Sequence, residues 1–259
     1  MSCSDPYLNT LRRQGYNVVR LPKADIRPLQ LLAKRGDALD RIGELVTVLP
    51  AGGPVPLPPV TADTPAASLS GQQSGDLSLG IGLSILGTVI GAMGGSKLGL
   101  DLKYQNAKSV TFEFVDVLEN RIEIAALDQY LAVADVSPFS SYVTKLLEAD
   151  QLYVTTATVK SSKIAVESKG SSGSGVDVSV PEIKGVVGGN VKVGAKSEKA
   201  SKVTYEGSVP LVFGFQAVRL FYEKGRYQRF EVLGGGAALE RAPEPAVLGE
   251  GPFVRMLDV

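Results

Sequence analysis

The sequence lacks histidine and tryptophan, and Cys3 is the single cysteine among its 259 residues. Without histidine, the chain cannot form a Ser-His-Asp or Cys-His nucleophilic site, a histidine-ligated zinc site or a histidine general base. One cysteine allows neither an internal disulfide nor a cysteine-cluster metal site. Carboxylate or lysine chemistry stays open, but no pair of these residues has a spacing that indicates an active site. We therefore predict that the protein is not an enzyme and binds no metal.

A net charge and an export signal are also missing. The 27 acidic and 27 basic residues cancel, so the overall charge gives no electrostatic reason to expect a nucleic-acid partner. The first residues do not show the basic region followed by an apolar core that is typical of a signal peptide. We therefore expect the intact protein in the cytoplasm, which argues against an exported outer-membrane barrel.

Charge is absent over one long stretch as well, residues 77–96. This length suffices for a helix to cross the ~30 Å hydrocarbon core of a bilayer. Within it, Gly87, Gly91 and Gly95 have the spacing that lets membrane helices pack closely. A fixed transmembrane helix is therefore one interpretation of the stretch.

The same stretch carries the period of a β-strand. Apolar residues occupy every second position before a glycine-rich tip at residues 91–96, and again after it, with small or charged residues between them. This alternation gives a strand one apolar face. We therefore favour a convertible amphipathic hairpin over about 77–104, and a buried hairpin of an ordinary soluble core is a third interpretation. The apolar face comprises Leu77, Leu79, Ile81, Leu83, Ile85, Leu98, Leu100 and Leu102.

A second alternating region spans about 153–206, with a glycine- and serine-rich tip at residues 170–175. Its arms are longer than the 9 to 11 residues, approximately, that a tilted strand needs to cross a bilayer. The opposite face carries Lys, Ser, Thr and Glu, including Thr156 and Thr158, and is predicted to be wet. The apolar face comprises Ala157, Val159, Ile164, Val166, Val176, Val178, Val191 and Val193.

The remaining patterns predict a conventional core. Residues 109–117 and 210–221 read as strands, and residues 124–134 and 138–147 carry apolar residues at helical spacing. We therefore predict an α+β fold, a twisted and mainly antiparallel sheet with helices packed beside it. A glycine run at 234–236 separates this body, residues 1–233, from a linker, 234–245, and a short C-terminal peptide, 246–259. The apolar residues of that peptide that could dock on a surface are Phe253, Val254, Met256 and Leu257.

Taken together, these features resemble the bacterial gasdermins. The resemblance rests on the Met-Ser-Cys-Ser start, the Asp-Pro-Tyr-Leu run at 5–8, the segment from Gly15 to Pro22, the two amphipathic regions and the short tail. The resemblance extends over the whole chain and concerns the order and the pattern of these features.

The resemblance implies a cytoplasmic monomer that its own C-terminal peptide holds inactive. A partner protease, often caspase-like, would cut before this peptide. The body would then oligomerise on the lipid bilayer of the inner membrane, where both hairpin regions extend into a large β-barrel pore. Cell death would follow, as a defence against phage. The resemblance also implies a palmitoyl or similar acyl chain on Cys3.

For the cleavage site we expect the stretch from Leu239 to Glu244, and within it Leu239, Glu240 and Arg241, because its composition predicts a flexible, exposed connection. Leu233 is an alternative. Arg241 is the best single candidate, for a protease that reads a basic side chain.

Two other functions stay open from the residues alone. The chain could be a soluble β-rich module that binds an apolar ligand or a protein partner, in which case tail removal should not make it attack membranes. It could also be a single-span membrane protein, in which case it should fractionate with membranes when uncleaved.

Overall fold

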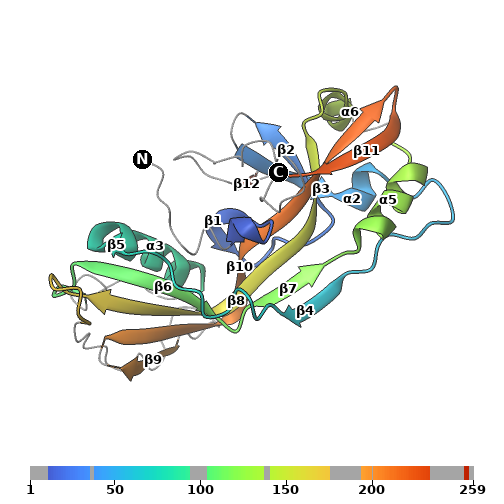
Figure 1. The fold of residues 1–259 in the computed structure, drawn as a ribbon. Coiled ribbons are helices and arrows are strands. Elements are labelled where there is room, and N and C mark those ends of the chain that lie inside the picture. The colour runs from blue at the N-terminus through green and yellow to red at the C-terminus, as the bar shows by residue number, and fades with distance from the viewer. Residues whose placement is uncertain are drawn as a thin grey trace.

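The computed structural model describes residues 11–35, 38–93, 104–136, 141–175, 194–199, 201–233 and 254–256. Two long antiparallel strands, β8 (Leu152–Lys169) and β10 (Lys202–Glu223), run along the length of the molecule (Figure 1). Their register shifts at three places, between Glu206 and Leu211, Val212 and Gly214, and Gln216 and Ala217. Irregularities of this kind bend and twist a sheet, so the pair can support different packing at its two ends.

The other strands assemble on this pair. The main path through the sheet follows the order β1-β10-β8-β2-β3-β12, and the remaining strands attach beside β8 and β10 or to their neighbours. All described pairings are antiparallel except that of β12 with β3. The further strands are β1 (Asn17–Lys23), β2 (Gln30–Arg35), β3 (Ala38–Glu44), β4 (Thr61–Pro65), β5 (Leu77–Ser78), β6 (Ser109–Val115), β7 (Leu118–Arg121), β9 (Gly194–Lys199), β11 (Arg226–Val232) and β12 (Val254–Met256).

Helices lie at both ends of the long pair (Figure 1). Near β11 are α2 (Leu45–Val48), α5 (Ile124–Val133) and α6 (Ser141–Glu148). At the other end, α3 (Leu79–Ala92) packs against β6 and also contacts β1 and β10. The helices α5 and α6 bury the apolar faces that their sequence period predicts, with Leu127, Tyr130 and Leu131 in one and Val143, Leu146 and Leu147 in the other.

Among the described residues, the core consists of three apolar clusters. The first joins α3 to β6, β8 and β10, and the second joins α2, α5 and α6 to the other end of the sheet. The third lies among β1, β2, β3, β8 and β10, around Phe215 and Tyr153. Each end of the long strand pair therefore has its own apolar packing.

The predicted fold class is confirmed: the chain forms a mainly antiparallel, twisted sheet with packed helices. The strands predicted at 109–117 and 210–221 appear as β6 and as part of β10, and the turn at Lys224 and Gly225 connects β10 to β11. Val110, Phe112 and Phe114 line the buried face of β6.

The predicted hairpin arm at 77–91 is wrong for this structure. Its strand ends after Ser78, and α3 begins at Leu79. The apolar residues of the arm also carry a helical spacing: Leu86, Val89, Ile90 and Met93 fall on one helix face, and all are buried. Packing of this face on the sheet outweighs the low helix propensity of its glycines.

The predicted wet face of β8 is wrong in the middle of the strand. Thr156 and Thr158 are 3% and 0% exposed. Thr158 is paired with Phe215 of β10, which belongs to the third apolar cluster. Both faces of β8 are therefore covered here, whereas Lys160 and Lys163 farther along reach solvent.

Candidate membrane-insertion region and C-terminal strand

Helix α3 is uncharged throughout and divides into two apolar faces. One face packs into the first cluster through Leu86, Val89 and Ile90. On the other face, Ile81 and Ile85 are 58% and 41% exposed. Leaving these side chains in water forgoes the stabilisation of about 1.5–3 kcal/mol that burial of each would give. The helix thus presents an apolar surface on its outer side as well.

A glycine sets the distance between α3 and the sheet. A Cβ atom at Gly82 would come within 2.1 Å of Cγ2 of Val110 on β6. Val110 is fully buried, and a branched side chain in a strand has few alternative rotamers. Close packing of α3 on β6 therefore requires glycine at this position.

Buried contacts join the α3 segment to the second predicted region. Met93, just after α3, packs against Gly207 of β10, where a Cβ atom would lie 2.9 Å from Met93 Cγ. The hydroxyl groups of Tyr104 and Tyr205 share a hydrogen bond with an O–O distance of 3.0 Å. Burial raises the pKa of both phenols above the ordinary value, most strongly for Tyr104. In this state the two regions form one packed unit.

Ion pairs surround the outer half of the long strands. Lysines of β8 and β10 reach carboxylates on the neighbouring segments, and Lys163 of β8 also lies 3.6 Å from the Glu206 carboxylate of β10. The hydrogen bond and charge of Asp116 raise the pKa of Lys163. Exposed pairs contribute little stability singly, but together they compensate the charges along this edge. The pairs are Lys160–Asp63 at 2.7 Å, Lys163–Asp116 at 2.7 Å, Lys169–Asp76 at 2.6 Å and Lys202–Glu113 at 2.9 Å.

At the end of the strand order, β12 pairs in parallel with β3 (Figure 1). The registered positions are Val254 opposite Leu39, Arg255 opposite Asp40 and Met256 opposite Arg41. The C-terminal peptide thus occupies the edge of β3 through three residues.

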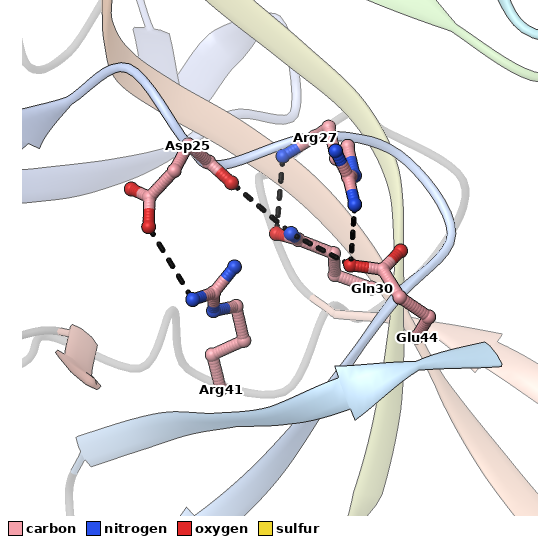
Figure 2. Close-up of polar contacts among 5 residues, drawn as sticks. All are labelled: Asp25, Arg27, Gln30, Arg41 and Glu44. Atoms are coloured by element: carbon pink, nitrogen blue, oxygen red, sulfur yellow. Dashed lines mark hydrogen bonds and ion pairs between the residues drawn. The ribbon is translucent and has the colours of Figure 1, made fainter. Parts of the chain in front are cut away.

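A polar cluster holds β3 beside the segment between β1 and β2 (Figure 2). Gln30 is fully buried; its side-chain amide donates to the Asp25 carbonyl at 3.0 Å and to Glu44 at 3.2 Å, and it accepts the Arg27 N–H at 3.1 Å. Ion pairs join Arg27 to Glu44 at 3.0 Å and Arg41 to Asp25 at 3.3 Å. Because Arg41 and Glu44 both belong to β3, the cluster fixes the strand that receives β12.

The structure thus places two of the four predicted docking residues, Val254 and Met256, in a strand. In the second region Ala157, Val159, Ile164 and Val166 are buried on β8, and in the first region Leu77, Leu79 and Leu83 pack against the first cluster. The other predicted positions lie outside the described residues: Cys3, Leu98, Leu100, Leu102, Val176, Val178, Val191, Val193, Leu239, Glu240, Arg241, Phe253 and Leu257.

Sequence reasoning missed the buried residues that organise these surfaces. Gln30 gave no signal, because a single glutamine between apolar residues has no distinctive pattern. Gly82 falls on the small-residue side of the strand alternation, so the sequence pattern does not indicate its contact with Val110. Within the described ranges, no group of three or more His, Cys, Asp or Glu residues is arranged to hold a metal ion. Of the helices described, none has the length and apolar content required to span a membrane.

Comparison with known proteins decides the family. Residues 19–226 match the model of the Bacterial Gasdermin Family. The chain belongs to the bacterial gasdermins. It is 54% identical to a gasdermin from a Desulfuromonadales bacterium over 266 residues, which covers 100% of both chains. It is 45% identical to a gasdermin from Lysobacter enzymogenes, over 99% of this chain and 95% of that protein.

The fold comparison agrees. The structure of a bacterial gasdermin from Bradyrhizobium tropiciagri is similar with a TM-score of 0.61 at 18% identity, covering 90% of this chain and 92% of that one. The resemblance inferred from the sequence is thereby confirmed. Gasdermins are pore-forming proteins rather than enzymes, so membership assigns this chain to a pore-forming class.

The contact at Gly82 makes the first testable prediction. Gly82→Ala should lower the free energy of unfolding by about 1–3 kcal/mol, because the added methyl group overpacks the interface with Val110. Gly80→Ala, two residues earlier in the same helix, is the matched control, since nothing lies within 4 Å of its Cβ position. It should be neutral or stabilising by up to about 1 kcal/mol. Urea unfolding followed by circular dichroism measures both, and equal effects would contradict the proposed contact.

The buried pair Tyr104 and Tyr205 predicts that the free energy of unfolding depends on pH in the alkaline range. The folded state keeps protons on Tyr104 and Tyr205 that the unfolded chain releases above about pH 10, so the free energy of unfolding should fall as pH rises past that value. The slope should reach as much as about 1.4 kcal/mol per pH unit for each tyrosine. The Tyr104→Phe/Tyr205→Phe double variant should fall less steeply in urea titrations from pH 9 to 11. Identical slopes would contradict the assignment of this effect to the pair.

Proposed function

We propose that this gasdermin is an autoinhibited pore former, activated when a protease removes its C-terminal peptide. In the proposed cycle, the intact monomer stays in the cytoplasm, and a caspase-like protease cuts the linker at residues 239–241. The freed body, residues 1–233, oligomerises on the inner membrane and forms a large β-barrel pore. The resulting cell death would protect a bacterial population against phage.

The observation that carries the proposal is the double pattern of residues 77–92. Residues 77–85 alternate with the period of a strand, yet Leu79–Ala92 forms a helix in this structure. The helix is uncharged, and it leaves Ile81 and Ile85 exposed. A segment with these properties can exchange its contacts with the sheet for lipid when it becomes a strand.

The second region supports the same mechanism. The outer part of β8 has Ile164 and Val166 on the face that packs in the first cluster with α3, and Lys163, Glu167 and Lys169 at alternate positions on the other face, where the buried Ala165 lies between Lys163 and Glu167. A strand with these two faces matches a barrel wall, apolar toward lipid and polar toward water. Its edge amides would be unsatisfied in lipid at a cost of several kcal/mol each. Closing many copies into a barrel removes that cost, so the inserted species must be an oligomer.

The C-terminal strand supplies a detachable element. The strand β12 pairs through only three positions with the edge of β3, and the linker precedes it in the sequence. Cleavage in this linker would leave a short peptide that can dissociate. An acyl chain on Cys3 would add reversible membrane affinity, because a single chain provides only marginal binding.

Dye release from liposomes tests the proposal. A specific protease site is inserted between residues 236 and 245, and the protein is added intact or cut to phosphatidylethanolamine/phosphatidylglycerol vesicles. Release is expected only after the cut, because only then can the body oligomerise and insert. The parent protein treated with the same protease is the control.

The lipid composition is varied, and circular dichroism checks that the cut body stays folded. No release from folded, cut protein across these lipids would contradict the pore mechanism and favour the soluble binding module. Release by the intact protein at the same rate would contradict gating by the tail.

A further inference from the structure

A line of irregularities crosses the sheet where β6 meets β7 (Figure 1). Strand β8 pairs with β6 from Lys163 onward and with β7 up to Lys160, so the ladder is interrupted between these two positions. On the other side of β8, residues 207–210 of β10 interrupt the pairing opposite Ser162. The line separates an outer part of the sheet, which comprises β6, residues 163–169 of β8 and residues 202–206 of β10, from an inner part, which comprises β7, residues 152–161 of β8 and residues 211–223 of β10.

The apolar face of β8 changes phase at this line. Ala157 and Val159 of the inner part are buried in the first cluster, and so are Ile164 and Val166 of the outer part. Odd and even positions of an uninterrupted strand face opposite sides of a sheet. The two pairs can therefore share one cluster only because the strand is irregular between them.

The corner between β6 and β7 shows the same change of phase. Phe114 and Val117 are both buried in the first cluster, although one stands at an even and the other at an odd position. Asp116 between them has a φ of 51°, in the left-handed region. The hydroxyl of the buried Ser161 donates a hydrogen bond to the Val115 carbonyl at 2.5 Å. This side-chain bond joins β8 to the corner where the ladder is missing.

The sequence prevents the break on β10 from becoming a regular ladder. Pro210 has no backbone N–H. In a closed barrel both edges of every strand are paired, so a proline leaves a neighbouring carbonyl without a donor. Hydrocarbon penalises such unpaired backbone groups strongly, whereas bulges are frequent at the rims of barrels. The line of irregularities therefore fits a rim and does not fit a membrane-spanning wall.

We propose that this line is the rim of the pore: the outer part of the sheet enters the membrane, and the inner part stays outside it. The proposal rests on the proposed function and deepens it by limiting the surface that contacts lipid. Ile164 and Val166 face lipid in the pore. Ala157 and Val159, which the sequence pattern assigns to the same face, stay packed in the body. Residues 164–206 exceed the two crossings of about 9–11 residues each that a hairpin needs.

The absence of tryptophan from the chain allows a direct test on the full-length protein with the inserted protease site. Phe112 of β6 lies in the outer part and Phe213 of β10 in the inner part, and both are buried in the first cluster. The protein is cut on phosphatidylethanolamine/phosphatidylglycerol vesicles with brominated acyl chains, which quench tryptophan on contact. Phe112→Trp should lose about half of its fluorescence, because this position faces lipid. The matched variant Phe213→Trp should lose less than about a tenth.

Equal losses in the two variants would overturn the rim, and so would an unquenched Phe112→Trp in vesicles that release dye. Dye release from the same vesicles separates this result from failure of the pore: cut, folded protein that releases no dye contradicts the proposed function, and the rim with it. Circular dichroism checks folding. If a variant does not fold, Tyr205→Trp replaces Phe112→Trp in the outer part, and Phe215→Trp replaces Phe213→Trp in the inner part.

Discussion

Amphipathic strands must have both their apolar faces and their edge hydrogen-bonding groups covered, and the rest of this structure depends on that constraint. In the described state, α3 covers the apolar face that β6, β8 and β10 present to the first cluster. The edge of β3 is covered by β12. Each of these two covering elements has few features that fix its position. The first, α3, is a helix whose sequence begins with strand alternation, and the second, β12, is a strand of three residues that follows the linker.

The two ends of the long strands differ in what they pack against. Near β11, side chains of α2, α5 and α6 form a conventional core with Tyr130 hydrogen-bonded to the Leu49 carbonyl at 2.6 Å. Near α3, the first cluster includes Phe114 stacked on Phe213 with ring centroids 4.0 Å apart, close contacts at Gly82 and Gly207, and ion pairs with flanking carboxylates around it. In the proposed cycle, the helical end serves as the scaffold while α3 exchanges its contacts.

Regular periodicity made much of the fold predictable from the sequence. The strand over β8 and the apolar spacing of α5 and α6 matched the structure because packing and local preference agree there, although the predicted wet face of β8 is buried in the middle of the strand. They conflict in residues 79–92, where alternate residues suggest a strand but Leu86, Val89, Ile90 and Met93 form a helical face. Burial against Val110 decides between them, and that contact is not visible in the sequence. The parallel pairing of β12 could not be predicted either, since three residues show no period.

The central claim is that residues 79–92 are a helix in the intact protein and a strand in the pore. A scan of spin labels on single cysteines at these positions, in a Cys3→Ser background, tests it most directly. In intact protein, water accessibility should follow the 3.6-residue period, with positions 81 and 85 exposed and 86 and 90 protected. After cleavage on liposomes, accessibility to lipid and water should alternate with a period of two. A 3.6-residue period that persists in the membrane-bound, cut protein would contradict the account.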